Sequence, residues 1–304
     1  MHIPHKPVLL QEIIETFSGI KSGTIVDCTL GYGGHSEALL KANPTINMVC
    51  IDQDSEALAF SKERLAPFGD RVKFLKGRFS DVISSIEEVE NIRGILADIG
   101  VSSLQLDKED RGFGFSSTTL DMRMDQSREF SAKDVVNGYK QEDLEYIFKT
   151  YGEVREYKKA ASIIVKEREL KPFESSSELA TFLAKYMKSY KLHPATLIFQ
   201  AIRIEVNDEL GELKRLLKSI KKLNINKSIV AIISFHSLED RLVKTTFKAW
   251  SKSCICPREV MRCSCGNDHQ LGTILTKKPI IPTNREIDEN PRSRSSKLRV
   301  FNIV

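Results

Sequence analysis

The sequence has no long apolar run. Among its 304 residues, no stretch approaches the roughly 18 consecutive apolar residues that a helix needs to span a bilayer. The N-terminal segment also lacks the basic flank, apolar stretch and small-residue cleavage site of a signal peptide. Hydrophobic residues make up 41% of the chain and charged residues 29%, which is typical of soluble globular domains. We therefore expect a cytoplasmic protein that does not contact membranes.

Cysteine is scarce, with six residues in two groups. Cys28 and Cys50 each lie alone in an apolar run, and we expect both to be buried as small hydrophobic residues. The second group contains four cysteines that are close together in the sequence. Four thiolates can form a tetrahedral zinc site, and a reducing cytoplasm disfavours disulfides. The C-x-C spacing of the second group is tighter than the usual C-x2-C, so a structural zinc site and a metal-free cluster both stay open. The second group has the pattern C-x-C-x6-C-x-C and consists of Cys254, Cys256, Cys263 and Cys265.

The positive charge is concentrated near the C-terminus. Residues 241–304 carry 13 Lys and Arg against 5 Asp and Glu, an excess of eight in a chain whose net charge is +5. Such an excess can attract the phosphate backbone of a nucleic acid, although a solvated basic surface also explains it.

Apolar, strand-like runs alternate with helical segments in the first hundred residues. This rhythm predicts a doubly wound α/β domain with a Rossmann-like parallel sheet. Residues 107–191 have a helical pattern without a convincing strand, and a strand pattern returns at 228–237. We therefore expect a core made of residues 1–106 and 192–304, interrupted by an inserted helical domain at 107–191. The four early runs are 23–30, 47–54, 71–77 and 92–101.

The residues that follow the strands predict a nucleoside-type ligand. Ligands of open α/β sheets lie beyond the carboxyl ends of the strands. A glycine-rich turn containing Gly33 and Gly34 follows the first run, and Asp52 follows the second, where it can accept hydrogen bonds from ribose hydroxyls. Ser36 breaks the dinucleotide pattern G-x-G-x-x-G.

Later strand ends complete a ring of candidate cofactor residues. Phe79 can lie over a purine or pack in the core, and these two readings are balanced. Asp98 closes an apolar run, where a carboxylate needs a partner or water, and Gln105 follows it. An acidic ribose anchor, an aromatic ring and a polar residue together favour S-adenosylmethionine over a nicotinamide dinucleotide.

Nine segments along the chain closely resemble, in order, the signature segments of the bacterial ribosomal RNA small subunit methyltransferase H family. The resemblance extends from His5 to about Val300. The segments are "HKPVLLQE", "VDCTLGYGGHS", "ADIGVSSLQLD", "RGFGFS", "LDMRMD", "KTYGE", "HPATLIFQAIRIEVNDEL", "ISFHSLEDRLVK" and "ENPRSRSSKLRV".

The resemblance implies an S-adenosylmethionine-dependent methyltransferase of class I with a helical insertion that recognises the substrate. Enzymes of the family methylate N4 of a cytidine in the decoding region of 16S rRNA, in the small ribosomal subunit or a late precursor, so we expect no DNA partner. The cofactor residues that it implies are Gly33, Gly34, His35, Asp52, Phe79, Asp98 and Gln105.

The group that accepts the amine proton stays open. Other amino-methyltransferases carry an Asn/Asp-Pro-Pro-aromatic tetrad after the fourth strand, whereas this chain has "DIGV" there. Asp98, the loop through Ser102 and Ser103, or a side chain from elsewhere could supply the acceptor. His236 lies at the ligand end of a strand and could contact the substrate or pack in the core. Ser237, with Asp240 three residues later, resembles a capping box that starts a helix.

Several residues are candidate RNA contacts, each with a structural alternative. Phe113 and Phe115 could stack on a flipped-out cytosine or anchor the insertion. Arg123 could contact RNA or form an ion-pair cluster with neighbouring aspartates. The basic residues near the end, which could bind phosphates or form a solvated surface, are Arg292, Arg294, Lys297 and Arg299.

Two other functions compete with methyl transfer. A nicotinamide-dependent oxidoreductase could use the same glycine loop, although the chain has no recognisable pair of residues for hydride transfer. A non-catalytic RNA-binding assembly factor could retain the same fold, which only the basic C-terminal region supports.

Overall fold

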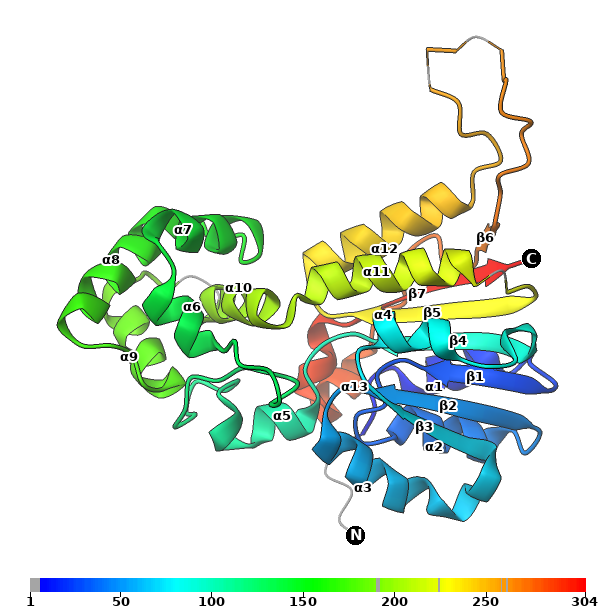
Figure 1. Ribbon diagram of the computed structural model, residues 1–304, viewed down its shortest axis with the longest axis horizontal. Coiled ribbons are helices and arrows are strands. Elements are labelled where there is room, and N and C mark those ends of the chain that lie inside the picture. The colour runs from blue at the N-terminus through cyan, green and yellow to red at the C-terminus, as the bar shows by residue number, and fades with distance from the viewer. Residues whose placement is uncertain (1–5, 190–191, 224, 258, 261) are drawn as a thin grey trace. The chain divides into compact units, whose positions relative to one another are not determined.

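The computed structural model describes residues 6–189, 192–223, 225–257, 259–260 and 262–304 (Figure 1). The chain forms two compact units, one containing residues 1–100 and 212–304 and the other containing residues 101–211. No helix in the described ranges is long and apolar enough to cross a membrane.

The first unit is an α/β domain. Helix α11 (Glu209–Lys222) begins in the second unit and continues into the first. The other elements of the first unit are α1 (Leu10–Phe17), β1 (Gly23–Asp27), α2 (Gly34–Ala42), β2 (Ile46–Asp52), α3 (Ser55–Leu65), β3 (Val72–Lys76), α4 (Phe79–Val82), β4 (Ile92–Asp98), β5 (Ser228–Ser234), α12 (Ser237–Trp250), β6 (Gly272–Ile274), α13 (Asn284–Glu289) and β7 (Lys297–Ile303).

The sheet has seven strands in the order β3-β2-β1-β4-β5-β7-β6. Strands β1 to β5 are parallel, and β7 runs antiparallel to both β5 and β6. The strand order reverses between β1 and β4, which is the switch point where doubly wound sheets bind ligands. The expected doubly wound sheet is confirmed, with one antiparallel strand near its edge.

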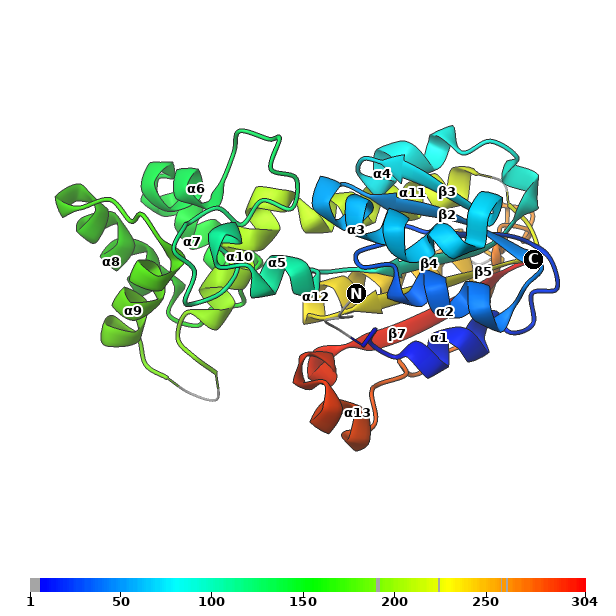
Figure 2. The same cartoon turned by 90° about the horizontal axis from the view of Figure 1, so that it is seen from below.

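Helices cover both faces of this sheet, as the two views show (Figures 1 and 2). One hydrophobic cluster joins one face to α11 and α12 and contains Val26 and Ile95. The other joins the opposite face to α1, α2 and α3 and contains Ile25 and Leu96. Neighbouring residues point to opposite faces of a strand, so a strand buried on both sides must be apolar throughout.

The second unit consists of helices around its own hydrophobic core, and its described residues include no strand. Phe148, Ile198 and Ile202 are fully buried in this core. The side chain of Asn207 accepts a hydrogen bond from Met124 N at 2.8 Å and donates one to Met122 O at 2.8 Å. The helices are α5 (Ser103–Asp107), α6 (Ala132–Gly138), α7 (Gln141–Thr150), α8 (Tyr157–Leu170), α9 (Ser176–Tyr186) and α10 (Thr196–Asn207).

The boundaries of the second unit differ from those expected from the sequence. Residues 192–211 are expected in the core from the sequence, whereas the structure groups them with the helical unit. The reason is that α10 packs against α6 and α7 and contributes Ile198 and Ile202 to the helical core. Whether this unit recognises the substrate stays a prediction.

A buried ion pair fixes α12 against β7. Arg299 is only 6% exposed, and its Nε lies 2.6 Å from Asp240 Oδ1 while Nη2 lies 3.2 Å from Oδ2. Arg299, a candidate for phosphate binding in the sequence, therefore has a structural role on β7. The pairing also explains Asp240, which the sequence predicts as part of a capping box with Ser237: the N-cap residue of α12 is instead His236, whose backbone N–H donates to Glu239 Oε2 at 3.3 Å.

We predict that Asp240→Ala destabilises the protein by about 3–5 kcal/mol, because the Arg299 charge would stay buried without its partner. Asp240→Leu combined with Arg299→Met should recover most of this loss, since the buried guanidinium is removed and Lys297, the other neighbour of Asp240, is partly exposed to solvent. Chemical denaturation monitored by circular dichroism measures the effect. If Asp240→Ala is as stable as the parent protein, the prediction is wrong.

Candidate functional site

The candidate site lies at the carboxyl ends of β1, β2, β4 and β5. Because these strands are parallel, their carboxyl ends meet at one edge of the sheet. Asp52 and Asp98 are the last residues of β2 and β4, and His236 follows β5. Among the sequence-predicted residues, the structure therefore gathers the glycine loop, both aspartates and the histidine at one edge.

The glycine loop turns β1 into α2 through left-handed backbone. Gly31 and Gly33 have φ of 50° and 72°, which non-glycine residues rarely adopt. At Gly34, a Cβ would lie 2.3 Å from Pro7 Cγ, so a side chain does not fit there. The first amides of α2 have no partner within the helix and lie at its positive end, where they favour a negatively charged group.

Asp52 holds the glycine loop in place. Its Oδ2 accepts a hydrogen bond from Gly31 N at 2.8 Å, and its Oδ1 accepts one from Asp54 N at 2.8 Å. Burial raises the pKa of Asp52 to about 6, although the two amide bonds lower it. Each carboxylate oxygen can accept a second hydrogen bond, so a ligand hydroxyl can still bind. The sequence pattern does not indicate this role in shaping the loop.

One carboxylate oxygen of Asp98 is unpaired. Its Oδ1 is buried and has no hydrogen-bond partner in the part of the chain that the structure describes. Its Oδ2 lies 3.8 Å from His35 Nδ1. Burial raises the pKa of Asp98 to about 6, the His35 ring lowers it, and Asp27 and Glu239 raise it. A buried acceptor without a partner is costly, and a bound ligand would satisfy it.

The side chain of His35 is already engaged. Its Nε2 lies 2.8 Å from Val8 O. A carbonyl oxygen can only accept, so Nε2 carries the hydrogen and Nδ1 faces Asp98. The ring therefore connects the N-terminal segment to the site, and the backbone amide is the part of His35 that a cofactor could use. This refines the expectation, because the tautomer depends on a contact that the sequence pattern does not contain.

His236 and Glu239 form a second group with unpaired atoms. Glu239 is fully buried, and its Oε2 accepts hydrogen bonds from Phe235 N at 2.9 Å and His236 N at 3.3 Å. Its Oε1 lies 3.2 Å from His236 Nε2. Both ring nitrogens of His236 and Glu239 Oε1 have no hydrogen-bond partner among the described residues. Glu239 was missed by the sequence analysis, although glutamate three residues after a helix cap is a capping-box signal.

Phe79 is half-buried and packs against the hydrophobic cluster beneath α11. The neighbouring residues fix the start of α4: Ser80 Oγ donates to Glu212 Oε2 at 2.6 Å, and Arg78 Nη1 donates to Glu212 Oε1 at 2.8 Å. Core packing therefore accounts for part of the Phe79 ring, and the exposed part stays available to a ligand.

The remaining polar candidates after β4 belong to the second unit. Gln105 is buried, and its Oε1 accepts a hydrogen bond from Ser102 N at 3.1 Å. Ser102 Oγ in turn accepts one from Gln105 N at 3.3 Å. Ser103 begins α5, and its side chain lies outside the described part of the structure.

The expected RNA contacts in the second unit differ in their exposure. Phe113 is buried in the helical core, as its structural alternative predicts. Phe115 is 39% exposed, and its ring lies 4.6 Å from the His193 ring. Arg123 makes two 2.7 Å hydrogen bonds to the carboxylate of Asp121, so its guanidinium is engaged in an ion pair.

The basic residues near the C-terminus lie on and just after a short 3-10 turn, Pro291–Ser295. Arg292 and Arg294 are exposed. Lys297 is half-buried, and its Nζ lies 3.8 Å from Asp240 Oδ2. Arg292 and Arg294 are therefore better placed than Lys297 to meet phosphates. The four clustered cysteines lie in the loop between α12 and β6.

Comparisons with known proteins cover the whole chain. The model of the MraW methylase family matches residues 2–304. The chain is 64% identical to the ribosomal RNA small subunit methyltransferase H of Aliarcobacter butzleri and 59% identical to that of Nitratiruptor sp., over 99% of each chain. A SAM-dependent methyltransferase from Aquifex aeolicus, which is 10% identical, gives a TM-score of 0.40 and covers 98% of this chain and 90% of its own.

The family match and the full-length identities both indicate a methyltransferase. The order of strands in the sheet and the position of the site at its switch point are consistent with this. The first unit thus has the class I fold of S-adenosylmethionine-dependent methyltransferases, and the chain belongs to the MraW methylase family.

Proposed function

We propose that the chain transfers a methyl group from S-adenosylmethionine to N4 of a cytidine in the decoding region of 16S rRNA. The observation that carries the proposal is Asp98, whose buried Oδ1 has no hydrogen-bond partner among the described residues at the switch point of a methylase sheet. The relatives named above are small-subunit rRNA methyltransferases, which supports rRNA of the small subunit as the substrate. A ribosomal substrate also supports a cytoplasmic location.

The residues of the site fit S-adenosylmethionine. The carboxylate of Asp52 would accept hydrogen bonds from the ribose hydroxyls, and the amides of Gly34 and His35 at the start of α2 would bind the carboxylate of the amino-acid end. Asp98 Oδ1 would accept a hydrogen bond from the ammonium of that end. The exposed part of Phe79 would lie against the adenine, and Gln105 is a further candidate contact. When bound, the cofactor supplies a methyl group activated by a sulfonium.

The protein's main catalytic task is alignment, because the N4 lone pair is delocalised into the cytosine ring. The chain must hold N4 in line with the methyl group and provide an acceptor for the proton that N4 loses. If Asp98 binds the ammonium, His236 is the better acceptor, since its Nδ1 lacks a partner among the described residues while its Nε2 faces Glu239 Oε1 at 3.2 Å. Its neighbour Glu239 would stabilise the ring once it is protonated.

Exposed side chains would contact the RNA. Arg292 and Arg294 offer guanidinium groups for phosphates. Phe115 offers an exposed ring on which a base could stack. The expected partner is 16S rRNA in the small subunit or in a late precursor. Membership of the methylase family argues against a nicotinamide-dependent oxidoreductase.

Methyl transfer tests the proposed function directly. We predict that the protein incorporates label from S-adenosylmethionine into small subunits from cells that lack this methylation. Nuclease digestion and mass spectrometry should identify N4-methylcytidine, and fully methylated subunits should take up no label. Label in another nucleoside would contradict the proposal. Binding of RNA without transfer would instead favour a non-catalytic assembly factor.

A pH series tests the role of Asp98. The pKa values of Asp98 and Asp52 in the free protein are raised to about 6, so both carboxylates take up protons as the pH falls through this value. We predict that cofactor affinity is constant above about pH 7 and falls as the pH drops to 5, by up to about tenfold per unit for each carboxylate that binds in its ionised form.

Asp98→Asn should weaken cofactor binding at pH 7 and make the remaining pH dependence shallower, whereas Asp70→Asn, at an exposed position of the same unit, should change neither. Isothermal titration calorimetry with S-adenosylhomocysteine measures both quantities. An affinity that stays constant from pH 5 to 7.5 would show that these carboxylates do not bind the cofactor.

The proposed role of His236 as proton acceptor can be tested separately from its position as the N-cap residue of α12. Asparagine is a good helix cap, so His236→Asn should keep the stability of α12 while removing the imidazole. We predict a loss of about 10²–10⁴-fold in kcat, as is typical when a proton acceptor is removed. Cofactor affinity and Tm should stay near those of the parent. A variant that retains its kcat would exclude His236 as the proton acceptor.

A further inference from the structure

The loop between α12 and β6 has no hydrophobic core of its own among its described residues. In Figure 1 it extends away from the sheet of the first unit. None of the hydrophobic clusters includes a described residue between 251 and 270. Ile255 and Val260 are 60% and 43% exposed. The loop is closed at its base by hydrogen bonds from Leu271 N to Trp250 O at 2.8 Å and from His269 N to Ser253 O at 3.0 Å.

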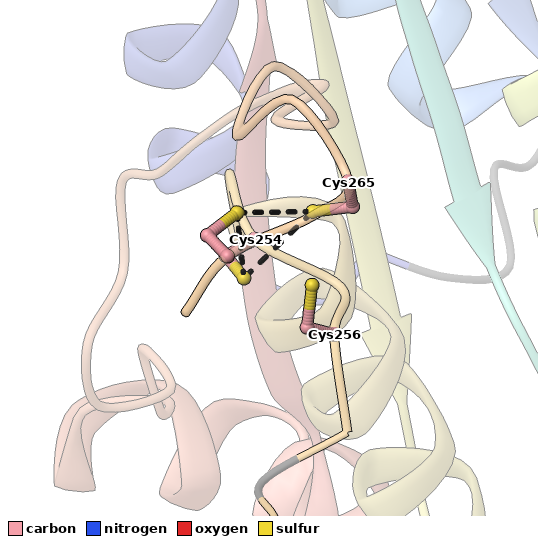
Figure 3. A group of neighbouring side chains, drawn as sticks. Cys254, Cys256 and Cys265 are labelled. Atoms are coloured by element: carbon pink, nitrogen blue, oxygen red, sulfur yellow. Dashed lines mark hydrogen bonds between the residues drawn. The ribbon is translucent and has the colours of Figure 1, made fainter. Parts of the chain in front are cut away.

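Four cysteine sulfurs nevertheless converge in this loop (Figure 3). The Sγ atom of Cys263 lies 3.6 Å from those of both Cys254 and Cys265, and Cys254 and Cys265 are 3.8 Å apart. All four sulfurs, including that of Cys256, lie within 4.8 Å of one another. All four cysteines are free.

These distances match a metal site better than disulfides. In a tetrahedron of sulfurs around Zn²⁺, with Zn–S bonds of about 2.3 Å, neighbouring sulfurs are about 3.8 Å apart. A disulfide needs its sulfurs about 2.05 Å apart. Tetrahedral coordination by four thiolates is characteristic of zinc and of iron–sulfur centres.

Two backbone amides donate to the sulfurs in a symmetric pattern. Ile255 N, in the middle of the first C-x-C pair, donates to Cys265 Sγ at 3.4 Å. Ser264 N, in the middle of the second pair, donates to Cys256 Sγ at 3.4 Å. Each pair therefore donates a hydrogen bond to a sulfur of the other. Such bonds stabilise thiolate charge and orient the ligands of a metal.

From this geometry we propose that Cys254, Cys256, Cys263 and Cys265 bind one Zn²⁺ ion that fixes the fold of the loop. The site keeps no open position for substrate, so the zinc is structural. Metal binding would supply the stability that a loop without a hydrophobic core lacks. The proposal is independent of methyl transfer, because no candidate cofactor or catalytic residue belongs to the cluster.

Elemental analysis of the full chain, purified under reducing conditions without chelator, tests the site. We expect one zinc per chain, and its loss when all four cluster cysteines are replaced by serine. Cys28→Ala removes a buried cysteine directly after β1, outside the cluster, and should leave the zinc content unchanged. Less than about a tenth of an equivalent in the parent, or iron in place of zinc, would overturn the proposal.

Two further measurements keep the test valid if the serine variant misfolds. Co²⁺ added to metal-free parent protein should give the intense absorption bands of tetrahedral thiolate coordination. Removing zinc with a chelator should expose the loop to limited proteolysis within residues 251–271 while the rest of the protein stays intact. No cobalt bands, or unchanged proteolysis after zinc removal, would contradict a structural zinc.

Discussion

The carboxylate of Asp52 joins the end of β2 to the glycine loop after β1. It receives one hydrogen bond from Gly31 N and one from Asp54 N, so a single side chain fixes the turn into α2 and the turn into α3. The direction in which α2 presents its first amides depends on that turn. The position of the proposed cofactor at the switch point depends on the same side chain, which would also bind its ribose. The same buried carboxylate therefore fixes the shape of the glycine loop and would bind the ribose.

A second set of contacts connects distant parts of the chain at the same edge. The His35 ring bridges Val8 and Asp98, and Asp98 N donates to Thr29 Oγ1 at 2.6 Å. Asp98 and Glu239 both retain buried oxygens without a partner among the described residues. The amide of Asp98 and the other carboxylate oxygen of Glu239 have partners, so the two unpaired oxygens are candidate positions for a ligand.

The sequence was sufficient to predict the parallel sheet, the glycine turn, and Asp52 and Asp98 at strand ends, because each follows from local periodicity and chain order. It could not predict that the His35 ring bonds to Val8 O, since that contact depends on how α1 packs. The cap of α12 was predicted one residue too late, because Asp240 was read as part of the cap and instead pairs with Arg299. The assignment of α10 also depends on tertiary packing, because an apolar helical face does not indicate which core it joins.

The pairing of β4 with β5 has a consequence for how the protein folds. These neighbouring strands are separated in sequence by residues 99–227, which include the whole helical unit. Closing so long a loop costs only about 0.6 kcal/mol more for each doubling of its length, so the insertion is thermodynamically cheap. Pairing between sequence-distant strands is nevertheless slow. The helical unit, which is one continuous segment with its own core, can fold first and shorten the effective loop, so the order of folding would run from the middle of the chain outward.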